Sequence, residues 1–235
     1  MNPYIDEDLL ALAEHARRFA VARVAPGYQE RDRTRSLDRE LMKAMGGMGF
    51  IENNKALCML SVLTSTHVLM AARDHGVERL FYSSSACVYA ADKQTNPEIT
   101  ALVEADAYPA MPEDGYGWEK LFSERMAHHF YEDYGLETRV ARYHNVYGPG
   151  MPRDTPYSGV AAIFRSSLEK GQPPRVFEDG GQMRDFVHVD DVAAANVAAV
   201  GSDGGGFLAA NVCSGRPISI MDVASRLCEA RGGPA

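Results

Sequence analysis

The chain has 235 residues, of which 46% are apolar and 24% charged, as in an ordinary globular protein. Its formal net charge of −8 argues against a general nucleic-acid binder, because such proteins present basic surfaces. No apolar run approaches the roughly 18 residues of a membrane-spanning helix, so no membrane partner is expected. The four cysteines are scattered and the N-terminus is acidic, which predicts a cytoplasmic protein with free thiols.

The first 45 residues predict a helical segment. An amphipathic stretch over 6–25 begins near Asp6, a plausible N-cap, and ends at Pro26-Gly27. A second short helix over 38–45 ends at Gly46-Gly47. We expect a helical hairpin that covers an apolar surface.

Helical and extended patterns then alternate from residue 51 to the end, which predicts an α/β fold with a parallel sheet. We divide this part into a partial dinucleotide-binding region, 46–150, and a partial substrate-binding region with a return strand and helix, 151–235. The expected helices cover 55–76, 116–134, 159–170, a stretch from a cap at Asp190 or Asp191 to about residue 200, and 219–231. The expected strands cover 77–82, 137–143, 175–178, a stretch beginning at Arg184, and 207–212.

The most informative stretch is Gly115-Tyr116-Gly117-Trp118-Glu119-Lys120, at the start of a predicted helix. Positions four apart share one face of a helix, so the ammonium of Lys120 is expected near the phenol of Tyr116. A nearby cation lowers the pKa of a tyrosine, and such a phenol can exchange a proton with a sugar hydroxyl. The alternative is an exposed pair at the start of a surface helix. Ser83 to Cys87 follow a predicted strand, at the end of the sheet where α/β proteins bind ligands.

Four sequence words, in this order, resemble those of the extended short-chain dehydrogenase/reductases: F-Y-S-S-S-A-C-V-Y, Y-G-W-E-K, R-Y-H-N-V-Y-G-P and R-D-F-V-H-V-D-D-V. The resemblance covers about residues 45–235. Residues 45–147 look most like GDP-mannose 3,5-epimerases, and 148–235 look more like dTDP-sugar 4-epimerases. The resemblance implies an incomplete Rossmann-like parallel sheet, NAD or NADP as cofactor, and a GDP- or dTDP-hexose as substrate.

This resemblance also implies roles for individual residues. Tyr116 would accept the C4 hydroxyl proton while NAD takes the hydride, Lys120 would lower the tyrosine pKa, and Ser85 would bond the reacting oxygen. Cys87 matches the proton-exchanging cysteine of the 3,5-epimerases, although a small core residue is the alternative, and residues 154–159 lack that cysteine's lysine partner. The implied cofactor contacts are Tyr116, Lys120, Ser83, Tyr143 and His144, and the implied substrate contacts are Gly46, Gly47, Met48, Asn145 and Arg184.

Several of these residues have simpler interpretations. Gly46 and Gly47 also suit the end of a helix, and Arg184 also suits a salt bridge with Asp185 or Asp190. The Met and aromatic residues of 121–134 are expected in the core. The pair His128-His129 has no third ligand in view, so no metal site is predicted. By analogy with the family, the helix over 116–134 predicts a homodimer.

Two features depart from the family. The chain contains no strand followed by G-x-x-G-x-x-G, since Gly46-Gly47-Met48-Gly49 has another spacing. Residues 14–50 instead resemble the N-terminal helices of acyl-CoA dehydrogenases. These changes suggest a mosaic, which could be a natural fusion, a misassembled reading frame or an artificial sequence. Three functions therefore stay open: a nucleotide-sugar epimerase, a non-catalytic remnant that binds a nucleotide sugar or a partner, and, ranked lowest, an acyl-CoA dehydrogenase-like flavoprotein.

Overall fold

The computed structural model describes residues 55–90, 92–95, 101–112, 114–151, 159–177 and 179–231. The chain divides into two compact units, Met1–Gly47 and Met48–Ala235, and all described residues belong to the second. The helices expected over 6–25 and 38–45 lie outside the described residues, as do Gly46, Gly47 and Met48. The described elements are α5 (Lys55–Met59), α6 (Val62–Asp74), β1 (Arg79–Ser85), η2 (Ala86–Val88), α7 (Asp92–Thr95), η3 (Glu104–Ala107), α8 (Gly115–Tyr134), β2 (Glu137–Tyr143), β3 (Asn145–Tyr147), α9 (Val160–Glu169), β4 (Met183–His188), α10 (Val189–Gly201), β5 (Phe207–Val212), β6 (Pro217–Ser219) and α11 (Ile220–Ala230).

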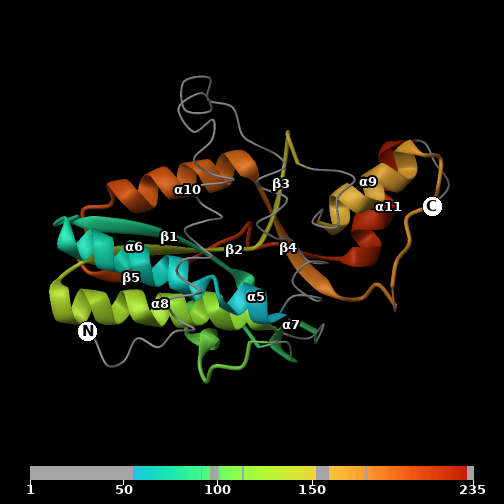
Figure 1. Cartoon of the computed structure of the whole chain (residues 1–235). Helices are drawn as coiled ribbons and strands as arrows, with labels where there is room; N and C mark the ends of the chain where they lie inside the picture. Colours follow the sequence, from blue (N-terminus) through green and yellow to red (C-terminus); the bar gives the residue numbers. More distant parts are fainter. Residues whose placement is uncertain are drawn as a thin grey trace, which may run out of the picture. The chain divides into compact units, whose positions relative to one another are not determined.

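Three parallel strands, in the order β1-β2-β5, form the main described sheet. Helices α6 and α8 lie on one face of this sheet and α10 lies on the other (Figure 1). Leu69 of α6 and Ala127 of α8 are buried in one apolar cluster that also includes Leu80 of β1. This layered arrangement confirms the predicted α/β fold with a Rossmann-like parallel sheet.

A smaller sheet, in the order β3-β4-β6, lies further along the chain. Strand β3 pairs with β4 in parallel, and β6 pairs with β4 antiparallel. Phe164 of α9 and Val223 of α11 are buried together beside this sheet. The sheet therefore has its own apolar cluster.

Three local predictions were wrong. The helix expected over 55–76 is interrupted at Leu60-Ser61, where backbone bonds between residues three apart replace the regular pattern. Residues 175–177 form no strand, and the preceding Pro173-Pro174 cannot donate backbone hydrogen bonds to a sheet. The cap of α10 is His188, whose Nδ1 accepts from the Asp190 amide at 3.3 Å.

Helix α8 is less buried than its composition suggests. Leu121 and Ala127 are buried, but the side chains of Phe122, Tyr131 and Tyr134 are exposed. The expectation that the aromatic residues of 121–134 form core is therefore wrong for these three. Among the described residues, no helix has the length and apolar content needed to cross a bilayer.

A buried ion pair joins α8 to the sheet. The guanidinium of Arg142 on β2 donates to the carboxylate of Glu124 on α8, with the shortest contact at 2.6 Å. Ser84 of β1 also donates to Glu124, and Arg142 donates to the Tyr89 hydroxyl at 3.1 Å. Burial lowers the pKa of Arg142, but the hydrogen bonds and charge of Glu124 outweigh burial and hold the pKa above its usual value.

We expect Glu124→Gln to lower the free energy of unfolding by about 3 kcal/mol, because it leaves the buried Arg142 without a counter-charge. Denaturant unfolding followed by circular dichroism measures this. Asp133→Asn, on the exposed side of the same helix, is the matched control and should change stability by less than about 0.5 kcal/mol. Equal effects of the two substitutions would contradict the assigned role of the pair.

Candidate active site

The carboxyl ends of the three parallel strands meet at one edge of the sheet. Ser85, the last residue of β1, stands in register with Tyr143, the last residue of β2. Tyr143 in turn stands in register with Val212, which ends β5. The predicted residues from strand ends therefore share one edge, as expected for ligand-binding groups of a parallel sheet.

Two glycines allow the start of α8 to approach this edge closely. A Cβ atom on Gly117 would lie 2.2 Å from the Cys87 carbonyl oxygen. Any side chain at this position would therefore force the backbone to move. A Cβ atom on Gly115 would lie 2.7 Å from the Lys55 carbonyl oxygen. Asp114 caps the helix by accepting from the Gly117 amide at 2.7 Å. The G-Y-G spacing is thus a packing requirement that brings Tyr116 to the end of β1.

The structure brings Ser85, Tyr116 and Lys120 together. The Ser85 side chain lies close enough to the Tyr116 hydroxyl to lower its pKa, and the Lys120 Nζ atom lies 5.5 Å from the centroid of the Tyr116 ring. Lys120 Nζ also donates to the Ser83 carbonyl oxygen at 3.2 Å. Cys87 belongs to the same group, since its amide donates to the Ser85 hydroxyl at 3.2 Å and its thiol acts on the Tyr116 pKa.

The pKa of Tyr116 is raised to about 12, first by burial and then by the neighbouring Cys87 thiol, while the hydrogen bond with Ser85 partly offsets them. The sequence-based expectation of a lowered pKa was therefore wrong. The Lys120 ammonium lies close to the Glu119 carboxylate, 3.9 Å away, which offsets its charge. Burial therefore decides the sign of the shift.

Glu119 is a residue that sequence reasoning missed. Its side chain is only 2% exposed, and its Oε1 accepts from the Ser123 hydroxyl at 3.1 Å. Its Oε2 lies 3.9 Å from Lys120 Nζ, beneath the amine that faces Tyr116. The sequence shows a glutamate beside this lysine, but only the tertiary structure shows that the carboxylate is buried.

The remaining predicted residues extend from this cluster along the sheets. The Tyr143 hydroxyl donates to Asn196 at 2.8 Å. Burial, the largest cause, lowers the pKa of His144, and its buried Nε2 finds no hydrogen-bond partner in the part of the chain that the structure describes. Asn145 of β3 donates to the Asp185 carbonyl oxygen of β4 at 3.1 Å, and Arg184 of β4 donates to the Met183 carbonyl oxygen at 2.8 Å.

These two substrate candidates therefore lie on the smaller sheet, and Asn145 begins β3 two residues after the end of β2. The Asp185 carboxylate, a proposed partner for Arg184, accepts instead from the backbone amides of Ser214 and Arg216. Gly46, Gly47 and Met48 lie outside the described residues. The substrate roles of all five residues stay predictions.

Comparison with known proteins shows the family. The "NAD dependent epimerase/dehydratase family" matches residues 46–212, and the chain belongs to this family. The "acyl-CoA dehydrogenase, N-terminal domain" matches residues 6–55, which confirms the resemblance predicted for the N-terminal segment.

Similar proteins come from plants and bacteria. A GDP-mannose 3,5-epimerase 1 of Oryza sativa subsp. indica is 41% identical over 162 residues, which cover 67% of this chain and 43% of the relative. A dTDP-L-rhamnose 4-epimerase of Burkholderia thailandensis is 35% identical over 144 residues, covering 59% of this chain and 38% of the relative. The chain thus spans about two fifths of the length of these curated relatives.

Solved structures share the fold. A UDP-glucose 4-epimerase with UDP-glucose from Thermotoga maritima aligns with a TM-score of 0.69 at 25% identity, over 84% of this chain and 67% of that chain. A UDP-glucose 4-epimerase of Thermus thermophilus in complex with NAD gives a TM-score of 0.59 at 31% identity, over 72% of this chain and 53% of that chain. Both likenesses support the Rossmann-like fold of the described sheet.

Gly117→Ala should lower the free energy of unfolding by about 2 kcal/mol, because the new methyl group overlaps the Cys87 carbonyl. Urea unfolding measures the change. Gly201→Ala, at the end of α10, is the control, because a Cβ there meets nothing within 4 Å. The control should leave stability unchanged or raise it slightly. A neutral Gly117→Ala would show that α8 does not approach η2 as described.

The raised pKa of Tyr116 predicts a specific pH response. Between pH 10 and 12 the unfolded chain loses this phenolic proton while the folded chain keeps it, so Tyr116 contributes less to stability as pH rises through this window. At pH 11, tyrosinate absorbance of the folded protein should be nearly the same with and without Tyr116→Phe. In urea at the same pH, the variant should show one tyrosinate fewer. A difference already present in the folded proteins would contradict the raised pKa.

Proposed function

We propose that this chain is an NAD-dependent nucleotide-sugar epimerase that oxidises C4 of a GDP- or dTDP-hexose transiently. The observation that carries the proposal is the cluster of Ser85, Tyr116 and Lys120 at the carboxyl ends of parallel strands, in a chain of the epimerase/dehydratase family. Relatives named for GDP-mannose and dTDP-L-rhamnose support these two substrate classes.

In this proposal Tyr116 acts as its phenolate, which takes the proton of the C4 hydroxyl and later returns it. Ser85 lies beside the tyrosine side chain and would hold the reacting oxygen next to it. Lys120, positioned by the Ser83 carbonyl and by Glu119, supplies positive charge within 5.5 Å of the Tyr116 ring. NAD, or NADP, when bound supplies the hydride acceptor and returns the hydride, so the net reaction is redox-neutral.

The residues around Tyr116 suit the nicotinamide and ribose end of a dinucleotide. Ser83, Lys120, Tyr143 and His144 lie at or beside the same sheet edge, and the buried Nε2 of His144 has no hydrogen-bond partner among the described residues. No described strand runs through a glycine-rich turn directly into a helix, so the described residues supply no cradle for the diphosphate. We therefore propose contacts only for the nicotinamide end of the dinucleotide.

The substrate side of the proposal rests on Asn145, Arg184, Gly46, Gly47 and Met48. We assign plain 4-epimerisation rather than exchange at C3 and C5. Cys87 lies near Tyr116 and could act from one side, but residues 154–159 offer no lysine to act from the other. A cytoplasmic location is part of the proposal, supported by four free cysteines.

A homodimer through α8 is also proposed. Trp118 and Phe122, four residues apart and 40% and 59% exposed, form an apolar stripe on this helix. Met59 of α5, which contacts α8, is 49% exposed. The net charge of −8 supports the expectation that no nucleic acid is a partner.

Tyr116→Phe tests the proposal. Nuclear magnetic resonance should detect C4 epimerisation of GDP-mannose or dTDP-L-rhamnose by the unmodified chain, and the substitution should reduce the rate at least about 100-fold, the usual contribution of a positioned acid–base group. Tyr134→Phe, an exposed tyrosine on the same helix, should keep full activity. Undiminished epimerisation by Tyr116→Phe would show that another group carries the proton.

The second candidate is a non-catalytic protein that binds a nucleotide sugar or a partner. It is favoured by the lack of a diphosphate cradle in the described part of the chain. Identifying the cofactor released from the purified protein distinguishes the two candidate functions. NAD supports the epimerase, and its absence together with inactivity supports the binder. Released flavin would revive the acyl-CoA dehydrogenase-like alternative.

A further inference from the structure

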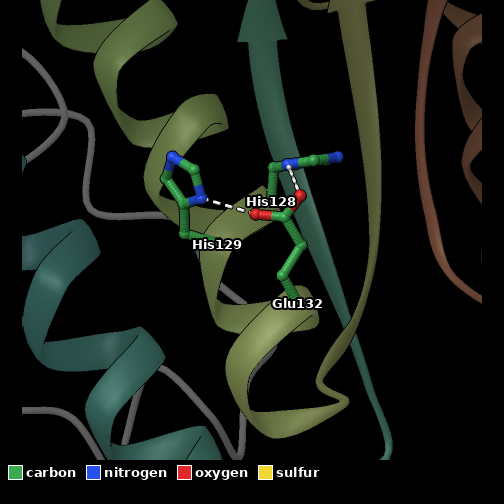
Figure 2. A group of neighbouring side chains, drawn as sticks. All are labelled: His128, His129 and Glu132. Carbon is green, nitrogen blue, oxygen red and sulfur yellow. Dashed lines mark hydrogen bonds and ion pairs between the residues drawn. The ribbon is translucent and has the colours of Figure 1, made fainter.

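A group of possible metal ligands lies on α8, away from the candidate active site. His128, His129 and Glu132 direct their side chains toward one another on neighbouring turns of the helix (Figure 2). The Nδ1 atom of His129 lies 2.6 Å from Glu132 Oε2, and the Nδ1 atom of His128 lies 3.4 Å from Glu132 Oε1. One ligand atom from each residue falls within 4.8 Å of the other two. The two imidazoles thus approach different oxygens of one carboxylate.

Packing against the sheet orients the first of these rings. His128 lies edge-on to the ring of Phe207, the first residue of β5, with centroids 4.8 Å apart. Its Nδ1 is buried and makes no hydrogen bond with any described residue. His129 and Glu132 are about half exposed, at 53% and 48%, so the group is open to solvent and its outer members can adjust. One ligand is therefore fixed and two are movable.

We propose that His128, His129 and Glu132 bind a divalent transition-metal ion of the zinc type. Two imidazole nitrogens and one carboxylate oxygen are a common three-residue zinc set, with water in the fourth position. Bonds of about 2.0–2.1 Å place neighbouring tetrahedral ligands roughly 3.3 Å apart, so the ligands would close by about 1.5 Å at most. Mg²⁺ and Ca²⁺ prefer oxygen ligands and should not compete.

The position of this site indicates a stabilising role. Lys120 and His128 are eight residues apart, or about 12 Å along the helix axis, so a metal there cannot reach the reacting atoms. It would tie two turns at the end of α8 together beside the start of β5. Binding to the folded chain alone raises stability by mass action.

Isothermal titration of the full chain with ZnCl₂, after removal of metals by a chelator, tests the proposal. We expect one binding event, with His129→Ala and Glu132→Gln each weakening the affinity at least about tenfold. Zinc should raise the melting temperature of the unmodified chain but not that of the two variants. Co²⁺ should give the visible absorption of a tetrahedral site, and Mg²⁺ should give no heat.

Two controls separate this site from other ligands. His67→Ala removes an exposed histidine of α6, and Cys213→Ser removes an exposed thiol; both should bind zinc as the unmodified chain does. The proposal is overturned if the unmodified chain binds no zinc. It is also overturned if His129→Ala and Glu132→Gln bind as tightly as the controls. Either result is independent of the epimerase proposal, because no activity is measured.

Discussion

The position of α8 depends on the buried ion pair of Glu124 and Arg142. Both side chains are almost fully buried, so each charge needs the other as its counter-charge. A shift of the helix along the sheet would leave two uncompensated charges. Ser84, one residue before Ser85, also donates a hydrogen bond to Glu124. The interaction that anchors the helix therefore also sets the position of Tyr116 relative to the end of β1.

This anchoring gives the candidate site its electrostatic character. Burial dominates the pKa of Tyr116, and the charge of Lys120 is shared with the Ser83 carbonyl and the Glu119 carboxylate. In the described chain the phenol is therefore a weak acid at neutral pH. A group that adds positive charge next to the ring would shift its proton affinity toward the range useful for acid–base chemistry.

Much of the fold could be predicted from local signals. The bounds of β2 and β5 agree with the sequence prediction, and α8 ends as expected at Gly135, whose φ of 72° suits a glycine. Residues 175–177 of the strand predicted at 175–178 form no strand, because the two prolines before them have no backbone N–H to donate to a sheet. The interruption of the helix at Leu60-Ser61 had no comparable signal in the sequence. The sequence motifs identified Ser85, Tyr116 and Lys120 as neighbours, but the burial of Glu119 could not be seen in the sequence.

By itself the sequence determined the alternation of elements, the family and the residues that gather at the sheet edge, because periodicity, glycines and short motifs are local properties. Only the tertiary structure decided which charges are buried and the sign of the Tyr116 pKa shift. Those properties depend on which side chains distant in sequence remove water from a group. For groups on α8, the removal of water is decided by the contacts of this helix with β1, β2 and β5 rather than by the helix's own residues.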